Sequence, residues 1–415
     1  MTSNNENRPG YKNTKIGWIP DDWEVGCLDD LGNFSKGAGI AKKDTVENGI
    51  PCVRYGEIYT THHYYIKKYC SFIAEKTIPT TRKLKKNDIL FVGSGETREE
   101  IGKAVAFLND DEVYAGGDII IFSPKSGLSL LLSYILNNEI VNRQKFKMGQ
   151  GHSVVHIYAN HLKKLLLPLP PLPEQKKIAE ILSTWDKAIS KYDTLISKYE
   201  LRKKALMQKL LTGKVRFKEF DEQEWKEVRI RDFGKVVTGS TPPMKDENNY
   251  GIDYCWVTAQ DFTEKYIIKS KIMVSEQGSK FCRLVPEGSI LITCIASIGL
   301  NAIAGTQLGT NQQINSIIVN ENFNNEFIYY LIEFNKNLMK SYAGQTAVPI
   351  INKNTFENIK LFCPKMVEEQ RKIASVLTAQ DKQIDLLKQQ KADLEQQKKG
   401  LMQKLLTGEV RVKVN

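Results

Sequence analysis

The stretch of sequence that decides the fold occurs twice. Residues 174–218 read EQKKIAEILSTWDKAISKYDTLISKYELRKKALMQKLLTGKVRFK, and residues 369–413 read EQRKIASVLTAQDKQIDLLKQQKADLEQQKKGLMQKLLTGEVRVK. The two copies align without a gap at an offset of 195 residues, and by direct count 23 of the 45 pairs are identical. Solenoid repeats have periods of about 20–50 residues, so this spacing is too long for a solenoid. It indicates a duplicated unit made of one globular domain and one long helix.

Both copies carry an apolar stripe whose members are separated alternately by three and four residues. This alternation is the 3.5-residue period of a coiled-coil seam. On a single helix so narrow an apolar stripe would remain exposed to water. We therefore expect the two helices to pack on each other. The alternative is that each helix covers its own domain. The expected seam residues are Ile178, Leu182, Trp185, Ile189, Tyr192 and Leu206 in the first helix, and Ile373, Leu377, Ile384, Leu387, Leu394 and Leu401 in the second.

Several seam positions are polar, and they differ between the two helices. Gln380 stands where the first helix has Trp185, and lysines occupy positions 203, 391 and 398. We expect these lysines to reach solvent or to pair with acidic side chains. Polar residues at such positions help to define the register of a coiled coil.

The duplication extends into the globular parts, which have diverged far more than the helices. At an offset of 202, Trp23 corresponds to Trp225, Gly32 to Gly234 and Gly37 to Gly239. Short β-branched runs, Gly/Asn/Asp turns and a few helical stretches predict a compact α+β domain in each half. The expected segments are a disordered tail at 1–14, globular domains at 15–167 and 214–362, and the two conserved helices with their lead-in segments at 168–213 and 363–415.

Composition narrows the class of protein. The chain has 415 residues, 41% of them hydrophobic, and a net charge of +11, which favours a polyanionic partner and nucleic acid before membrane. No apolar run is long enough to span a bilayer, and the first residues lack a signal-peptide core. Seven cysteines without a C-x-x-C pair fit reduced thiols in the cytoplasm better than disulfides or zinc.

Catalytic and cofactor motifs are mostly missing. Residues 91–95 read FVGSG and are similar to a loop that holds S-adenosylmethionine in methyltransferases, but no companion motif of Asn/Asp/Ser-Pro-Pro-aromatic type follows. The five histidines have no carboxylate or cysteine partners at metal-ligand spacing. We therefore expect no catalytic residue, no metal and no cofactor. A DNA methyltransferase or nuclease in its own right is the alternative.

Polar side chains suited to DNA lie beside glycine-containing loops. Lysine and arginine neutralise phosphates or read guanine, whereas asparagine and glutamine suit adenine. The candidate DNA-binding residues are Lys36, Arg54, Tyr55, Ser94, Arg98, Lys103 and His152 in the first half, and Thr238, Thr241, Gln260, Asn311, Gln312, Gln313 and Gln345 in the second.

With these features in view, the chain resembles the specificity subunit of type I DNA restriction–modification systems over nearly its full length. The resemblance rests on IGWIPDDWE at 16–24, LPLPPLPEQKKIAEIL at 167–182, and KKALMQKLLTG at 203–213 with its repeat KKGLMQKLLTG at 398–408. It implies two target-recognition domains separated by an antiparallel coiled coil. It also implies double-stranded DNA and two methyltransferase subunits as partners, with two restriction subunits recruited through them.

The resemblance implies that each globular domain reads one half of a split DNA target. Because the two domains differ in sequence, we expect the two half-targets to differ. Ile178 to Leu210 spans 32 steps of about 1.5 Å, or roughly 48 Å of helix, which is long enough to separate two readers by one DNA turn or more.

Overall fold

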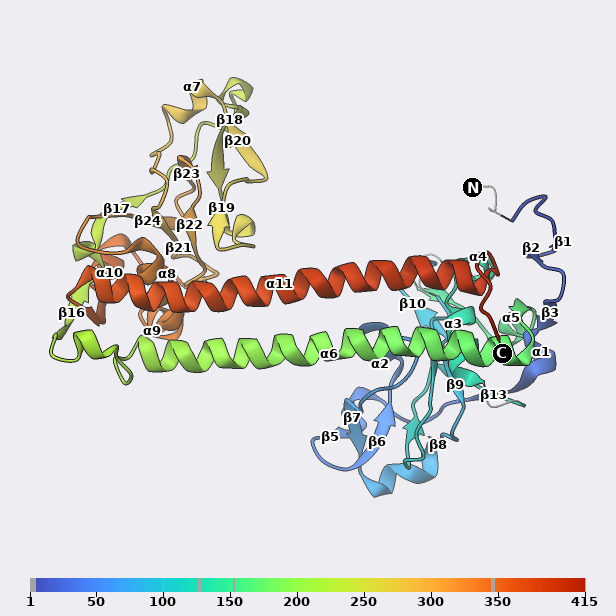
Figure 1. Cartoon of the computed structure of the whole chain (residues 1–415). Helices are drawn as coiled ribbons and strands as arrows, with labels where there is room; N and C mark the ends of the chain where they lie inside the picture. Colours follow the sequence, from blue (N-terminus) through green and yellow to red (C-terminus); the bar gives the residue numbers. More distant parts are fainter. Residues whose placement is uncertain (1–4, 100, 126–127, 152–153, 345–347, 415) are drawn as a thin grey trace. The chain divides into compact units, whose positions relative to one another are not determined.

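The computed structural model describes residues 5–99, 101–125, 128–151, 154–344 and 348–414. The chain divides into two compact units: unit 1 contains residues 1–191 and 390–415, and unit 2 contains residues 192–389. Helices α6 (Leu172–Leu210) and α11 (Val367–Leu406) each contribute one end to each unit (Figure 1). The compact units therefore do not separate where the globular domains were expected to meet the helices.

Unit 1 is built on two sheets. One is antiparallel, with strand order β4-β13-β9-β11, and the other has the order β5-β7-β6-β12-β8 with β12 parallel to β6. Further strands pair as β1 with β2, β3 with β15, and β10 with β14. The strands are β1 (Tyr11–Thr14), β2 (Gly17–Pro20), β3 (Glu24–Cys27), β4 (Gly32–Lys36), β5 (Thr45–Val46), β6 (Ile50–Val53), β7 (Ser71–Ile73), β8 (Arg82–Lys83), β9 (Ile89–Val92), β10 (Ser94–Gly95), β11 (Ala104–Ala106), β12 (Tyr114–Ala115), β13 (Ile119–Pro124), β14 (Val155–His156) and β15 (Leu166–Leu169).

The remaining helices of unit 1 are short. They are α1 (Leu28–Leu31), α2 (Tyr55–Thr60), α3 (Ser129–Leu136), α4 (Glu139–Met148) and α5 (Ala159–Leu162). Residues 11–14 were expected in a disordered tail, and that expectation is wrong, because they form β1 and pair with β2 in a hairpin. Tyr11 also donates a hydrogen bond from its hydroxyl to the carbonyl of Gly408, which ties this hairpin to the end of α11.

Unit 2 repeats the same plan. Its first sheet has the order β17-β24-β21-β22-β19, its second has the order β20-β18-β23, and β16 pairs with β25. The strands are β16 (Trp225–Arg229), β17 (Gly234–Thr238), β18 (Tyr250–Val257), β19 (Tyr266–Ile267), β20 (Ile272–Val274), β21 (Ile290–Thr293), β22 (Asn301–Ala304), β23 (Leu308–Thr310), β24 (Ile314–Val319) and β25 (Lys360–Pro364). The helices are α7 (Glu276–Ser279), α8 (Asn325–Phe334), α9 (Lys336–Ser341) and α10 (Lys353–Asn358).

The repeated glycines have a steric explanation in this shared plan. A Cβ on Gly37 would lie 2.1 Å from the carbonyl oxygen of Gly116, and one on Gly239 would lie 2.2 Å from the carbonyl oxygen of Asn311. Both distances are far below van der Waals contact. A side chain at either position would therefore clash with the backbone of the turn that leads into β13 or β24. This explains why both halves have glycine there.

The coiled-coil seam is confirmed within each unit. In unit 1 the buried start of α6, with Ile178 and Leu182, shares a core with Leu405 at the end of α11. In unit 2 the buried start of α11, with Ile373 and Leu377, shares a core with the end of α6. All the predicted seam residues of both helices are buried or half-buried, as the 3.5-residue period requires. In both units the start of one helix packs on the end of the other, so the helices are antiparallel.

A buried glutamate joins the two helices and the globular part in each unit. In unit 1, Trp23 donates from its indole nitrogen to Glu174 at 3.0 Å, and Arg411 donates to both Glu174 oxygens at 2.9 and 2.8 Å. Unit 2 repeats this arrangement with Trp225, Arg216 and Glu369. These hydrogen bonds raise the pKa of both arginines. Each hydrogen-bonded clamp thus joins the EQ pair of one copy of the repeat to the VR pair of the other copy.

A second repeated network contains two of the seam lysines, Lys203 and Lys398. In unit 1, Lys398 donates to Asp186 at 2.9 Å, and Tyr134 of α3 donates its hydroxyl proton to the same carboxylate. Both Lys398 and Asp186 are buried, so Lys398 pairs with an acid and does not reach solvent.

Unit 2 has the equivalent contacts. Lys203 pairs with Asp381, and Tyr330 of α8 donates its hydroxyl proton to that aspartate. Each network therefore joins a helix of the globular part to both long helices.

Candidate nucleic-acid interface

Five of the predicted DNA-binding residues of unit 2 come together in the structure. Thr238 ends β17, Thr241 lies in the loop that follows, and residues 311–313 form the turn between β23 and β24. Thr241 and Gln312 are hydrogen-bonded through their side chains, and Asn311 donates to Gln313 at 3.3 Å. These side chains are exposed or half-buried, so amide and hydroxyl groups from two distant stretches of sequence form one polar surface. We call it the amide cluster.

Arg283 belongs to the same surface, although the sequence offered no sign of it. Its guanidinium donates to the carbonyl of Thr238 at 3.0 Å, and its backbone amide donates to the Ser240 hydroxyl at 3.1 Å. The side chain is exposed. An anchored guanidinium at the edge of an amide cluster is suited to phosphate or guanine. Arg283 follows α7, far from the other members in sequence, so only the fold brings it here.

The remaining candidates of unit 2 lie apart from the amide cluster or outside the residues that the structure describes. Gln260 lies just after β18 and accepts a hydrogen bond from Lys271 at 3.1 Å. Its side chain is exposed. Gln345 lies outside the residues that the structure describes, as does His152 of unit 1.

The equivalent surface of unit 1 carries different side chains on the same backbone. Lys36 ends β4 as Thr238 ends β17, and residues 116–118 form the turn that corresponds to residues 311–313. The backbone amide of Gly93 donates to the backbone carbonyl of Asp118 at 2.9 Å, and in unit 2 the amide of Cys294 donates in the same way to the backbone carbonyl of Gln313 at 2.8 Å. Unit 1 therefore presents a lysine, two glycines and an aspartate where unit 2 presents a threonine and three amides.

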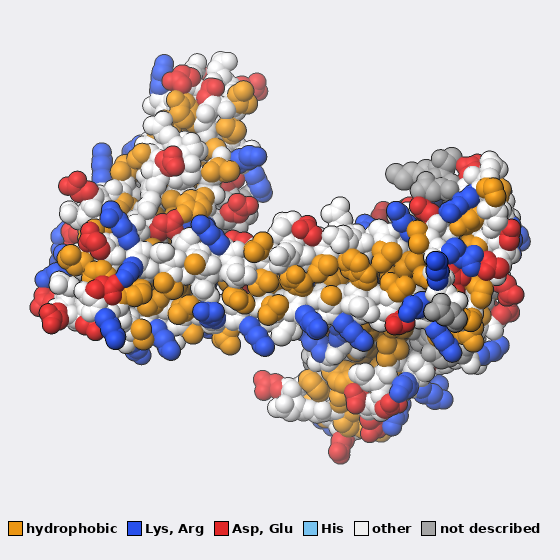
Figure 2. Space-filling model, in the orientation of Figure 1, with side chains coloured by type: hydrophobic (Ala, Val, Ile, Leu, Met, Phe, Trp, Pro, Cys, Tyr) orange, Lys and Arg blue, Asp and Glu red, His pale blue; other side chains and the backbone are white. Residues whose placement is uncertain are grey.

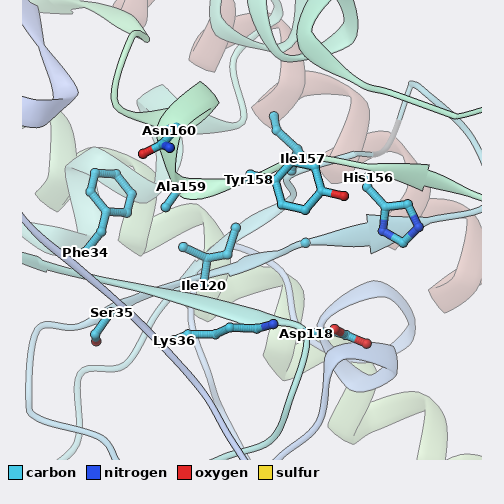
Figure 3. A pocket seen from close by; sticks show the side chains of 11 residues that line it. Phe34, Ser35, Lys36, Asp118, Ile120, His156, Ile157, Tyr158, Ala159 and Asn160 are labelled. Carbon is cyan, nitrogen blue, oxygen red and sulfur yellow. The ribbon is translucent and has the colours of Figure 1, made fainter.

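Lys36 and Asp118 lie at a pocket of about 420 Å³. Phe34, Ile120 and Ile157 line it with apolar surface, while Lys36 and Asp118 point toward one another along one side (Figure 3). The residues lining it include Phe34, Ser35, Lys36, Gly93, Asp118, Ile120 and residues 156–160. Gly93 belongs to the FVGSG stretch, so this motif contributes to a pocket on the candidate interface.

Other predicted residues of unit 1 have structural roles. Ser94 is buried, and its carbonyl accepts a hydrogen bond from the hydroxyl of Tyr59 at 3.0 Å. Lys103 is half-buried and donates to the carbonyl of Tyr59 at 3.0 Å. Both residues support the backbone around Tyr59, and these contacts favour a structural role for them.

The other two basic candidates remain accessible, together with Tyr55. Arg54 precedes α2 and is half-buried, and Tyr55 begins that helix with an exposed ring. Arg98 is exposed and donates to the carbonyl of Gly151 at 3.4 Å. Lys and Arg side chains are spread over the visible face of the protein with acidic side chains between them (Figure 2). Charge alone therefore does not locate the interface.

Comparison with known proteins decides the family. The sequence profile of the type I restriction modification DNA specificity domain matches residues 20–197 and again residues 222–396. The chain belongs to this family. It is a type I specificity subunit with two target-recognition domains, and such a subunit recognises DNA and is not itself an enzyme.

Relatives and solved structures agree with this assignment. The putative type I restriction enzyme MjaX specificity subunit of Methanocaldococcus jannaschii is 30% identical, with 97% of each chain covered. The MjaVIII specificity subunit of the same organism is 27% identical, over 95% of this chain and 94% of that one. The S subunit of a type I system from M. genitalium has a similar fold, with a TM-score of 0.59, 17% identity, and 92% of this chain and 96% of that one covered.

Other site classes find no support in the described residues. Over that part of the chain, no group of three or more His, Cys, Asp or Glu side chains is arranged to hold a metal ion. Among the helices described, none combines the length and the apolar character that crossing a membrane requires.

Proposed function

We propose that this specificity subunit binds double-stranded DNA and reads a bipartite, asymmetric target. The globular part of each unit reads one half. The observation that carries the proposal is the pair of equivalent surfaces described above, in which one backbone framework presents Lys36 and Asp118 in unit 1 but the amide cluster in unit 2. Different donors and acceptors on equivalent frameworks suit different base edges. Two identical readers would carry the same side chains.

We also propose that the subunit recruits two methyltransferase subunits and, through them, two restriction subunits. The clamps around Glu174 and Glu369 support this assignment, because they repeat one arrangement of Trp, Glu and Arg in both units. A repeated framework offers the same surface twice, which suits two copies of one partner. The chain would then supply recognition, while its partners supply S-adenosylmethionine-dependent methylation of adenine.

The decisive experiment is to sequence the methylated adenines in a host that expresses this chain with its methyltransferase subunits. We expect one split target with two different halves. The double variant Thr241→Ala/Gln312→Ala should then relax or change only the half read by unit 2, since it removes two members of the amide cluster. A matched control is Gln223→Ala, an exposed glutamine of unit 2 that lies outside the amide cluster. It should leave the target unchanged.

Two outcomes would contradict the proposal. Methylation or cleavage of DNA by the purified chain alone would make it an enzyme in its own right. DNA retention by the assembled complex that did not change with salt would also speak against it, because phosphate contacts by lysine and arginine make binding strongly salt-dependent.

A further inference from the structure

The pocket beside Gly93 is lined by residues that differ between the two units. Gly93 and Cys294 occupy equivalent places: the carbonyl of Gly93 accepts from Ile157 at 2.9 Å, as that of Cys294 accepts from Ile351 at 2.9 Å. In unit 2 the Cys294 side chain is buried and accepts a hydrogen bond from Asn315 at 3.3 Å. Asn315 in turn accepts from Thr238 at 2.7 Å.

Unit 2 thus has three side chains at these positions that are linked by hydrogen bonds. In unit 1 the corresponding positions are Gly93, Ile120 and Lys36. Glycine has no side chain, and isoleucine cannot form such a hydrogen bond. The side chains that line the pocket are therefore specific to unit 1 and do not follow from the shared fold.

The lining combines apolar walls with a polar rim. Phe34 and Ile157 supply apolar surface, and Lys36 and Asp118 supply a cation and a carboxylate (Figure 3). Tyr158 remains 54% exposed, and its ring lies nearly parallel to that of His156, at 15° with 6.3 Å between the centroids. The volume of about 420 Å³ falls near the lower end of the range of about 300–1,000 Å³ found for small organic ligands.

These properties suit a nucleobase better than any other part of DNA. A base has two apolar faces that stack on aromatic rings, and an edge of hydrogen-bond donors and acceptors that lysine and aspartate can contact. A phosphate would meet the carboxylate of Asp118 and the apolar walls, both of which disfavour it. A base paired inside a duplex cannot enter a pocket, so it must first leave the stack.

We propose that the Gly93 pocket of unit 1 takes one nucleobase of the target DNA, turned out of the duplex. This inference rests on the proposed function, because it assumes that unit 1 contacts DNA through this surface. It assigns this mode of reading to unit 1, because in unit 2 the equivalent positions hold Cys294, Asn315 and Thr238, which are hydrogen-bonded to one another.

The test uses the complex of the full chain with its methyltransferase subunits and duplexes that carry 2-aminopurine at successive positions of the half-target read by unit 1. Unstacking raises the fluorescence of this base analogue. We expect a several-fold rise at one position on binding. A mismatch at that position should tighten binding, because an unpaired base leaves the stack at lower cost.

The variant Gly93→Cys introduces the residue that unit 2 already has, and it should abolish both effects. Tyr158→Ala removes an exposed ring, leaves the core intact and should weaken both effects. Cys294→Ala in unit 2 is the matched control and should change neither. Thermal unfolding of each variant would show whether it folds normally.

Two results would overturn the inference while leaving the proposed function intact. One is normal binding and methylation of the split target without a fluorescence rise at any position read by unit 1. The other is an unchanged rise in well-folded Gly93→Cys and Tyr158→Ala complexes. If the complex recognised no split target at all, the proposed function itself would fail. Tight binding of S-adenosylmethionine to the chain alone, lost in Gly93→Cys, would assign the pocket to that cofactor and would also overturn the inference.

Discussion

Replacing Lys398 by methionine should destabilise unit 1 strongly, because it would leave the buried carboxylate of Asp186 without its cation. The side chains of Lys398 and Asp186 are only 4% and 5% exposed. Burial lowers the pKa of Lys398, and Asp186 acts in the opposite direction. Removing one partner of such a buried pair typically costs about 3–5 kcal/mol.

Neighbouring groups add to this loss. The Lys398 ammonium lies 3.9 Å from the ring centroid of Tyr64 and 5.0 Å from that of Tyr134. Such desolvated cation–π contacts contribute on the order of 1–2 kcal/mol. The hydroxyl of Tyr134 would still donate to Asp186, which offsets part of the cost. We therefore expect a loss of about 3–5 kcal/mol in the free energy of unfolding of unit 1.

The chain contains its own control for this experiment. Lys203 and Asp381 make the equivalent pair in unit 2, but their side chains are 24% and 20% exposed. Water reaches that pair, so Lys203→Met should cost only about 1–2 kcal/mol, between the values for exposed and buried pairs. The double variant Lys398→Met/Asp186→Asn removes the buried charge together with its partner and should recover at least about 1 kcal/mol relative to Lys398→Met.

The assay is native-state hydrogen exchange of the full chain, which measures the opening of each unit separately. Amides of α3 and of the end of α11 report on unit 1, and those of α8 report on unit 2. The reasoning would be refuted if Lys398→Met lowered the protection of unit 1 by less than about 1 kcal/mol. It would equally fail if the two lysine variants had the same effect, or if Asp186→Asn added its full cost to that of Lys398→Met.

Three further predictions follow from other parts of the structure. Burial lowers the pKa of Lys145 to about 7, against 10.5 in the unfolded chain, so stability should rise as pH increases from about 7 to 9, and urea midpoints of Lys145→Met should lack that rise. In this pH range the unfolded state holds the Lys145 proton and the folded state does not, so raising the pH favours the folded state. Equal pH dependence of stability in both proteins would contradict this. Arg411→Lys should lower the melting temperature by several degrees, because lysine cannot donate to both oxygens of Glu174 in the bidentate manner of arginine. The control Arg8→Lys loses one exposed hydrogen bond to a carbonyl and should change the melting temperature little. Inserting four residues near Thr194 lengthens α6 by about 6 Å, or one to two base-pair rises, so sequencing of methylated sites should give the same two half-targets with a wider gap; altered half-targets would contradict this.

Much of the fold could be predicted because it depends on local patterns. The alternation of three and four residues identified the seam of α6 and α11, and short β-branched runs indicated an α+β domain in each half. Glycine at 213 and 408 ends each helix with φ near 70°, a conformation that glycine adopts without strain. The order of the strands could not be predicted, because it depends on contacts between segments far apart in the chain.

The candidate site was predicted only in part. Thr238, Thr241 and residues 311–313 were selected separately, for residue type beside glycine loops, and the fold brings them together. Arg283 was missed because nothing in its neighbourhood distinguishes it. Ser94 and Lys103 were selected for the same reasons as the others, yet each forms a hydrogen bond with Tyr59 that supports the local backbone.

The sequence by itself determined that this protein is a duplicated specificity subunit with two long paired helices, because periodicity, repeats and motifs are properties of the chain alone. Only the tertiary structure decided which charges meet and which spaces remain open. Asp186 meets Lys398 across 212 residues, and the pocket beside Gly93 is formed by side chains of β4 and β13 together with residues 156–160. Burial and close packing depend on all the segments that meet at a point, and no single stretch of sequence contains them.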